Sequence, residues 1–271
     1  MLVDHPLPPP FDDWPRPLAF VLSGGGGYGS VQVGMLQALV DRDIHPDLVV
    51  GSSVGALHGA MLAAKGERSL AEMRELWRSI SRRAVFGRRR DIIGNLRRDG
   101  SLANFDRLTD LIETHLGVDH FDDLDIRFGA VATDVLTGEP ELLSDGELTP
   151  ALLASAAVPG SFPSVDLGGR GYVDGGVVAN VPIRQAIAFG ARSVLSLDAT
   201  PPTFASKPPS SITGSLLHSV SLMLRSQRAN AVDDLAHRYR VAVLPSATPP
   251  DMGSFNFGRT DELLDSSYRL A

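Results

Sequence analysis

The sequence predicts an α/β fold, a three-layer sandwich in which a mainly parallel central sheet carries helices on both faces. Short apolar runs alternate along the chain with longer stretches of helical periodicity, which is the pattern of repeated strand–helix units. The chain has 271 residues, 43% of them hydrophobic, which is enough to cover both faces of such a sheet. Two glycine-rich loops near the start each join an apolar run to a helical stretch. These loops also contain most of the residues from which a function can be predicted.

The individual elements follow from this alternation. Strands are expected where a short apolar run stops at a turn-forming residue, over 17–23, 47–51, 126–134, 139–144, 171–174, 192–198 and 239–245. Helices are expected where apolar residues recur with helical spacing, over 29–42, 54–65, 69–81, 104–116, 148–157, 181–190, 212–237 and 259–269. The stretch 200–211 is rich in proline and serine and is expected to be a surface loop. Residues 1–16 form a proline-rich N-terminal segment, and 17–271 are expected to form one domain.

The first glycine-rich loop contains residues 24–27 and Gly29. Glycines that enter a helix leave backbone N–H groups without partners, which suits a negatively charged oxygen. Gly24, Gly26 and Gly29 also match the dinucleotide-binding fingerprint. A nucleotide fold places an acidic residue at the end of the next strand, whereas Asp47 stands at its start. The sequence has no G-K-[ST] phosphate-loop motif.

The second loop has the spacing G-x-S-x-G, supplied by Gly51, Ser53 and Gly55. Between a strand and a helix, this spacing is typical of a nucleophile elbow, whose glycines permit a turn so sharp that the serine hydroxyl is exposed. Ser53 is therefore the candidate nucleophile. Together the two loops favour acyl transfer over nucleotide binding.

A serine nucleophile needs a base, and histidine is the usual one. Of the seven histidines, His218 and His237 come late enough for the Ser–acid–His order of an α/β-hydrolase. Both fall in the long helix expected over 212–237, and we interpret them as residues of its surface.

The better candidate base is Asp174, which ends an expected strand. Gly175 and Gly176 follow it and let the backbone pass close to another loop. An aspartate held against a serine hydroxyl can accept its proton directly, provided that partial burial raises its pKa toward neutrality. The sequence thus predicts a Ser53–Asp174 dyad.

In these motifs the sequence resembles the patatin-like phospholipases, lipid acyl hydrolases that use a Ser–Asp dyad. The resemblance covers about residues 18–200, with the three motifs in the family's order and matching stretches at 130–134, 154–163 and 180–182. It implies that Ser53 is the nucleophile, Asp174 the base, and the backbone amides of Gly25, Gly26 and Gly27 the oxyanion hole. The motif glycines are Gly24, Gly29, Gly51, Gly55, Gly175 and Gly176. The resemblance implies neither a metal nor an organic cofactor.

The implied activity is hydrolysis of a lipid ester, as in a phospholipase, a lysophospholipase or a related esterase. One alternative is an acyltransferase that passes the same acyl group from Ser53 to an alcohol or a thiol. Another is a catalytically weak regulator that keeps the fold to bind lipid or a protein. This last alternative stays open because Tyr28 stands where family members usually carry Arg or Lys.

Composition limits the remaining classes. The net charge of −7 argues against general nucleic-acid binding, and the absence of cysteine excludes disulfides and thiolate metal sites. The first 16 residues lack the basic start and apolar core of a signal peptide, and no apolar run reaches the roughly 18 residues of a membrane span. A cytoplasmic protein without a transmembrane segment is expected.

The segment 78–98 carries eight arginines with apolar residues between them. It is interpreted either as part of a solvated insertion over 78–100 or as a cap. In the second interpretation its arginines contact anionic lipid while Phe86, Ile92 and Ile93 touch acyl chains, which would make the protein peripheral at the membrane. The sequence leaves both interpretations open.

Overall fold

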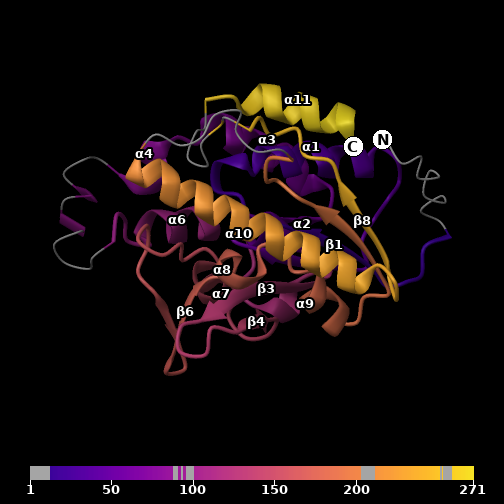
Figure 1. Cartoon of the computed structure of the whole chain (residues 1–271). Helices are drawn as coiled ribbons and strands as arrows, with labels where there is room; N and C mark the ends of the chain where they lie inside the picture. Colours follow the sequence, from indigo (N-terminus) through magenta and orange to yellow (C-terminus); the bar gives the residue numbers. More distant parts are fainter. Residues whose placement is uncertain are drawn as a thin grey trace.

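The computed structural model describes residues 13–87, 91, 92, 94, 95, 101–202, 211–250, 252 and 258–271. In this part of the chain, eight strands form one sheet in the order β5-β6-β3-β2-β1-β7-β8, with β4 paired to β3 (Figure 1). The strands are β1 (Leu18–Leu22), β2 (Leu48–Ser52), β3 (Arg127–Asp134), β4 (Pro140–Leu143), β5 (Val165–Leu167), β6 (Arg170–Asp174), β7 (Ser193–Leu197) and β8 (Arg240–Leu244). The run β3-β2-β1-β7-β8 is parallel, and β4, β5 and β6 extend the sheet by antiparallel pairing. The prediction of a mainly parallel sheet is confirmed.

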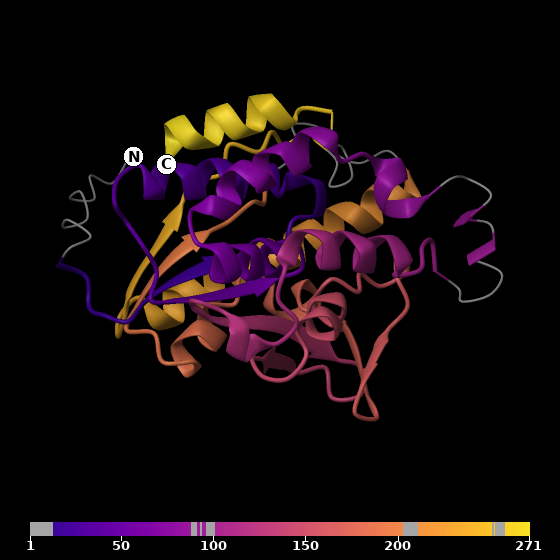
Figure 2. The ribbon, with the colours of Figure 1, turned by 180° about the vertical axis from the view of Figure 1, so that it is seen from behind.

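Helices cover both faces of this sheet, as Figures 1 and 2 show from opposite sides. On the face seen in Figure 2 lie α1 (Ser30–Val40), α2 (Val54–Lys65), α3 (Arg68–Ser79), α6 (Asp106–Leu116), α7 (Leu148–Ser155) and α11 (Thr260–Leu270). On the face seen in Figure 1 lie α8 (Gly176–Ala179), α9 (Ile183–Ala188) and α10 (Ile212–Leu235). The three-layer arrangement predicted from the sequence is therefore confirmed.

The alternation of side chains along β1 shows why two helical layers form. Leu18, Phe20 and Leu22 are buried in the core shared with α1, α2 and α3. Ala19 and Val21 point to the other face and pack in a second core with residues of α9 and α10. Because successive side chains of a strand point to opposite faces, a strand that is apolar at every position must be covered twice.

The remaining differences from the predicted elements concern short segments. The structure adds β5, the helix α4 (Arg82–Phe86), α8, and two 3₁₀ helices, η2 (Gly26–Tyr28) and η3 (Phe121–Asp123). All of these have only three to five residues, too few to show a periodicity. The helix expected over 212–237 ends at Leu235, so that prediction is corrected at its end and His237 lies in the following turn. Most of the surface loop expected over 200–211 lies outside the described residues, as do residues 1–12.

The helix α11 packs across α1 at Gly34. A Cβ atom at this glycine would lie 2.2 Å from Oγ of Ser267 and 2.4 Å from the carbonyl oxygen of Leu264. The two helices therefore approach each other closely because position 34 has no side chain. None of the helices that the structure describes has the length and hydropathy needed to cross a bilayer.

Candidate active site

Ser53 stands alone between the end of β2 and the start of α2, in a strained backbone conformation. Its φ is 55° and its ψ is −127°, a region that residues with a side chain rarely adopt. Serine is a favoured residue at this position before a helix because its hydroxyl usually caps the first amides. Here the side chain of Ser53 makes no capping hydrogen bond. The hydroxyl is therefore not committed to the helix.

The glycines of the elbow are explained by the backbone that surrounds it. A Cβ at Gly55 would lie 2.3 Å from the carbonyl oxygen of Leu22, at the end of β1. A Cβ at Gly51 would lie 2.3 Å from the carbonyl oxygen of Gly55. Any side chain at these positions would push α2 away from the sheet, so the G-x-S-x-G spacing is a packing requirement as well as a motif.

Asp174 is the last residue of β6 and is buried. Oδ1 of its carboxylate accepts a hydrogen bond of 2.7 Å from the amide of Gly176. Burial raises the pKa of Asp174 to about 6, against the opposing effect of the Ser53 hydroxyl and the Gly176 amide, which both stabilise the charged form. Oδ2 is buried and has no hydrogen-bond partner of ordinary geometry within the described residues. The Ser53 hydroxyl therefore lies near enough to the Asp174 carboxylate to stabilise its charge, but without the geometry of an ordinary hydrogen bond.

The register of three strands brings the two side chains together. In the β2–β3 pair, Ser52 is opposite Val131, and in the β3–β6 pair, Ala132 is opposite Asp174. A Cβ at Gly175 would lie 2.1 Å from the carbonyl oxygen of Val131. The absence of a side chain at position 175 thus lets the chain turn beside β3 directly after Asp174.

Ser155, the last residue of α7, connects these elements. Its hydroxyl accepts a hydrogen bond of 3.1 Å from the amide of Ser53 and donates one of 2.6 Å to the carbonyl of Val131. Its own carbonyl accepts a hydrogen bond of 3.3 Å from the amide of Gly175. Ser155 falls in the matching stretch 154–163, but sequence reasoning assigned it no role. No local pattern indicates a contact between positions so distant in the chain.

The first glycine-rich loop passes beside Ser53. A Cβ at Gly24 would lie 3.3 Å from Cβ of Ser53 and 2.5 Å from Oδ1 of Asn180. The amide of Gly24 donates to the carbonyl of Asn180 at 3.0 Å, which fixes the loop to the segment that follows α8.

The loop then turns into η2. The amides of Tyr28 and Gly29 close this turn by donating to the carbonyls of Gly25 and Gly26, at 3.1 Å each. The amides of Gly25, Gly26 and Gly27 come at its start, where N–H groups have no partner inside a helix. Gly26 has a φ of 54°, which a glycine adopts without strain.

Tyr28 packs into the main core rather than toward solvent. Its hydroxyl donates a hydrogen bond to the carbonyl of Met252, and burial raises its pKa to about 12. The position at which the resembled family usually carries a cation is thus filled by a neutral side chain that ties the glycine-rich loop to the C-terminal segment.

A buried chain of hydrogen bonds also supports the glycine-rich loop. The side-chain amide nitrogen of Gln32 donates to the carbonyls of Ser23 and Leu197, at 2.8 and 3.0 Å. The Gln32 oxygen is 2.9 Å from Nδ1 of His58, and the indole N–H of Trp77 donates to Nε2 of His58 at 2.8 Å. This assignment makes His58 a neutral ring that donates through Nδ1, and burial lowers its pKa to about 3. Sequence reasoning missed this network.

The histidines considered as bases do not meet Ser53. His218 lies in α10 and His237 in the turn after it. In the described part of the chain, two side chains interact with Ser53. Asp174 interacts with its hydroxyl, and Ser155 interacts with its backbone amide. Within the same residues, no group of three or more His, Asp or Glu side chains is arranged to hold a metal ion.

Only part of the arginine-rich segment lies within the described residues. Arg78 forms an ion pair of 2.8 Å with Asp261 at the protein surface, so its charge already has a partner within the chain. Val85 and Ile92 pack against a small core around Phe162. The later part of the segment lies outside the described residues. It contains Ile93 and five of the arginines expected to contact lipid, Arg88, Arg89, Arg90, Arg97 and Arg98.

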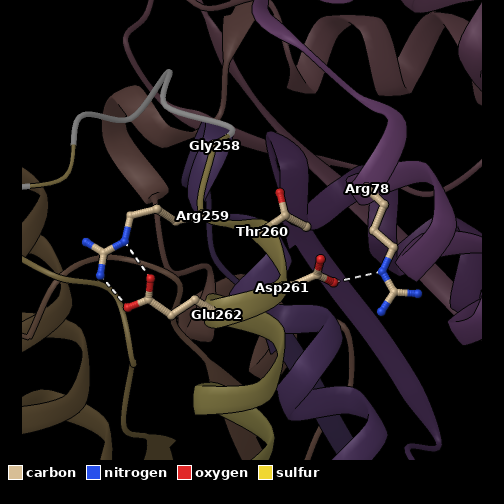
Figure 3. A pocket seen from close by; sticks show the side chains of 6 residues that line it. All are labelled: Arg78, Gly258, Arg259, Thr260, Asp261 and Glu262. Carbon is tan, nitrogen blue, oxygen red and sulfur yellow. Dashed lines mark hydrogen bonds and ion pairs between the residues drawn. The ribbon is translucent and has the colours of Figure 1, made fainter.

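A shallow pocket of about 310 Å³ lies beside Arg78, at the start of α11 (Figure 3). Its charged side chains are already paired, Arg78 with Asp261 and Arg259 with Glu262. Neither Ser53 nor Asp174 lines it. This pocket is therefore separate from the candidate active site.

Comparison with known proteins shows which family this sequence resembles. The family model of the patatin-like phospholipases matches residues 20–187. A patatin-like phospholipase domain-containing protein of Caenorhabditis elegans is 30% identical over 197 residues, which are 67% of this chain and 13% of that protein. Lysophospholipase NTE1 of Mycosarcoma maydis is 29% identical over 192 residues, 67% of this chain and 10% of that protein. An uncharacterized NTE family protein of Mycobacterium bovis is 30% identical over 166 residues, 61% of this chain and 44% of that protein.

The chain thus spans less than half the length of each of these relatives. Among solved structures, VipD from Legionella pneumophila superposes with a TM-score of 0.52 at 14% identity, covering 94% of this chain and 66% of VipD. At that identity the likeness concerns the fold. The family model covers more than half of the chain, in the region that contains Ser53 and Asp174, and the chain therefore belongs to the patatin-like phospholipase family.

Proposed function

We propose that this protein is a serine lipid acyl hydrolase in which Ser53 is the nucleophile and Asp174 is its base. The observation that carries the proposal is the approach of the two side chains, one on a strained elbow and the other a buried carboxylate with a pKa of about 6. A base with such a pKa is ionised at neutral pH and still accepts a proton readily. Members of this family are typically lipid acyl hydrolases, which supports the same reaction class.

The reaction proceeds in two steps. Oγ of Ser53 attacks the ester carbonyl carbon while its proton passes to Asp174, and the carbonyl oxygen becomes an oxyanion facing the amides of Gly25, Gly26 and Gly27. Collapse of this intermediate breaks the ester C–O bond, and Asp174 returns the proton to the departing alcohol. A water molecule then attacks the acyl group on Ser53 by the same route and releases the fatty acid.

The substrate class follows from the relatives. One relative is named a lysophospholipase and others are patatin-like phospholipase domain proteins. We therefore assign a phospholipid or lysophospholipid ester as the substrate. Water is the acceptor in this proposal, and an added alcohol that captures the acyl group would instead identify a transferase.

Two neighbouring serines provide the test. Ser52→Ala removes a fully buried hydroxyl that has no hydrogen-bond partner among the described residues, whereas Ser53→Ala removes the proposed nucleophile. The wild type and Ser52→Ala should react with a fluorophosphonate probe and release fatty acid from lysophospholipid, and Ser53→Ala should do neither. Labelling at another serine, or turnover that survives in Ser53→Ala, would refute the proposal. A wild type that is neither labelled nor active would favour the regulator.

A further inference from the structure

The side chain of Asn180 is a buried polar group that the proposed mechanism does not use. Only 4% of this residue is exposed. In the described part of the chain its hydrogen bonds are made by its backbone: the carbonyl accepts one of 3.0 Å from the amide of Gly24, and the amide donates a long one of 3.5 Å to Oε1 of Gln227. A carboxamide has two N–H donors and one acceptor oxygen, and buried polar groups normally have partners. Asn180 therefore holds a donor group that the fold itself does not use.

The short helix α8 places this carboxamide beside Asp174. Asn180 directly follows α8 and keeps helical backbone angles, with a φ of −60° and a ψ of −36°. In such a backbone, the side chain of residue 180 leans toward the N-terminus and lies over residue 176, one helical turn earlier. A Cβ at Gly176 would lie 3.0 Å from Oδ1 of Asn180 and 2.9 Å from Oδ1 of Asp174. The carboxamide therefore occupies space that a side chain at position 176 would fill, next to the proposed base.

The same carboxamide lies against the start of the glycine-rich loop. A Cβ at Gly24 would lie 2.5 Å from Oδ1 of Asn180 and 3.3 Å from Cβ of Ser53. Cγ of Asn180 is farther than Oδ1 from both glycine positions, at 3.6 Å from the one at Gly24 and 3.9 Å from the one at Gly176. With this assignment of the amide atoms, Oδ1 faces the two glycines, and Nδ2 is the group that remains for a partner.

Contacts on two sides fix the backbone from which this side chain projects. Gln227 of α10 donates a hydrogen bond of 2.9 Å to the carbonyl of Val177, and its Oε1 accepts the bond from the amide of Asn180, so α10 holds α8 where the two helices meet (Figure 1). On the other side, the bond from the Gly24 amide joins Asn180 to the glycine-rich loop. A donor that is fixed before the substrate arrives needs no reorganisation during the reaction, which is the property of an effective oxyanion hole.

We infer that Asn180 is a further residue of the oxyanion hole, whose Nδ2–H donates a hydrogen bond to the carbonyl oxygen of the bound ester. The inference rests on the proposed function, since that oxygen becomes an oxyanion when Oγ of Ser53 adds to the carbonyl carbon. The amides of residues 25–27 face the same oxygen in that mechanism, and Gly24, against which the carboxamide lies, directly precedes them. As negative charge develops on the oxygen, the bond from Nδ2 strengthens, so Asn180 favours the transition state over the bound substrate.

Two variants of Asn180 test the inference through the kinetics of ester hydrolysis. Asn180→Ala removes the donor and leaves space, whereas Asn180→Leu removes the donor and fills the space. In both variants kcat should fall by about 10²–10³ while KM stays close to the wild-type value, because the lost bond acts mainly in the transition state. A kcat within a few-fold of the wild type in either folded variant would overturn the inference.

Stability separates a substrate-binding carboxamide from a structural one. Gln32 is the matched control, because its buried carboxamide donates hydrogen bonds to the carbonyls of Ser23 and Leu197. Gln32→Ala should lower the denaturant midpoint of unfolding clearly, since it leaves buried carbonyls without a donor. Asn180→Ala should lower the midpoint much less, because its carboxamide gives up no hydrogen bond within the described fold. Equal losses in the two variants would show that the Asn180 carboxamide is bonded inside the protein and would overturn the inference.

An inhibitor without a leaving group identifies the oxygen that Asn180 contacts. Oγ of Ser53 adds to the carbonyl carbon of a long-chain trifluoromethyl ketone and forms a tetrahedral adduct with an oxyanion, but no alcohol departs. The inhibition constant of this ketone should rise in Asn180→Ala by about the same factor of 10²–10³ as kcat falls. Equal inhibition of the wild type and Asn180→Ala would assign the contact to another oxygen and overturn the inference.

The wild type distinguishes this inference from the proposed function. An active wild type with an equally active Asn180→Ala contradicts the inference alone and leaves the roles of Ser53 and Asp174 intact. A wild type that neither hydrolyses esters nor reacts with a fluorophosphonate probe contradicts the proposed function, and the inference that rests on it fails as well.

Discussion

The hydroxyl of Ser155 holds the backbone amide of Ser53 at 3.1 Å, across 102 positions of the sequence. The same hydroxyl is anchored on Val131 by a hydrogen bond of 2.6 Å, so it fixes the strained elbow to the neighbouring strand β3. A serine with a φ of 55° needs such support, because the relaxed conformation lies elsewhere. Ser155 is a positioning residue in this account, since it contacts the backbone of the proposed nucleophile and not its hydroxyl.

Replacing Ser155 should therefore affect turnover more than a similar change elsewhere. Ser155→Ala leaves the Ser53 amide and the Val131 carbonyl without this partner, which costs about 1–3 kcal/mol of unfolding free energy and should lower kcat by roughly tenfold or more. Ser69→Ala is the matched control, because the buried Ser69 hydroxyl also donates to a carbonyl at 2.6 Å, that of Gly66. Chemical denaturation and ester hydrolysis should show similar stability losses but a kcat loss in Ser155→Ala alone. Equal kcat values in the two variants would contradict the positioning role.

Asp174 should make opposite contributions to activity and to stability. Activity should fall as the pH drops through about 6, because the protonated carboxyl no longer accepts the Ser53 proton. The pKa of Asp174 is higher in the folded protein than the usual 3.8, so ionisation of this group destabilises the fold as the pH rises through about 6. Asp174→Asn should thus be inactive yet more stable than the wild type at pH 8, by up to about 3 kcal/mol, with the gain disappearing below about pH 4. Thermal unfolding of both proteins across this range measures it, and a variant less stable than the wild type at every pH would be the contrary result.

The glycine-rich loop should be sensitive to a side chain at Gly26. The φ of 54° makes alanine costly there, by about 1–2 kcal/mol, and misplaces the amides beside Ser53. Gly66 is the control, because its φ is 56° and a Cβ would meet nothing within 4 Å. Both alanine variants should lose similar stability, but Gly26→Ala should also lose about 10²–10³ in kcat, the usual effect of removing an oxyanion donor. Turnover that is equal in the two variants would place the oxyanion hole elsewhere.

His58 should make the protein sensitive to acid. Burial lowers its pKa in the folded state to about 3 from the usual 6.5, so stability is full above pH 6.5 and is lost as the pH falls toward 3. At pH 4 this loss amounts to roughly 3 kcal/mol for the wild type. His58→Gln keeps an amide that bonds to Gln32 and Trp77 but does not titrate, so its unfolding free energy should depend less on pH in this range. Parallel pH curves for the two proteins would exclude His58 as the source.

The sequence predicts the layers of this fold well because the apolar periodicity of its strands and helices is a local property. Every strand expected from an apolar run exists in the structure, within about two residues at each end. The strand β5 was missed because its three residues are partly exposed and show no apolar run. Antiparallel pairing of β6 with β3 was not predicted either, since strand direction depends on connections and not on composition.

The residues of the candidate site likewise fall into those that the sequence predicts and those that it does not. Ser53, Asp174 and the motif glycines could be predicted from the sequence, because each motif occupies a few consecutive positions. Ser155, Gln32 and His58 act through single contacts with residues far away in the chain, and a lone serine, glutamine or histidine in a helical stretch looks like any other. The identity of Tyr28 is visible in the sequence, but its bond to Met252 is not.

The contact of α11 with α1 has a consequence for the way this protein is made. Gly34 contacts Leu264 and Ser267, which lie about 230 residues later, so this side of α1 stays uncovered until nearly the whole described chain has been synthesised. At roughly 5–20 residues per second, that delay is on the order of ten seconds or more. The surface of α1 around Gly34 is open to solvent or to a chaperone throughout this time, because closing a contact over so long a loop is both late and slow. Final assembly of the helical layer seen in Figure 2 is therefore expected to follow translation of α11 rather than to accompany that of α1.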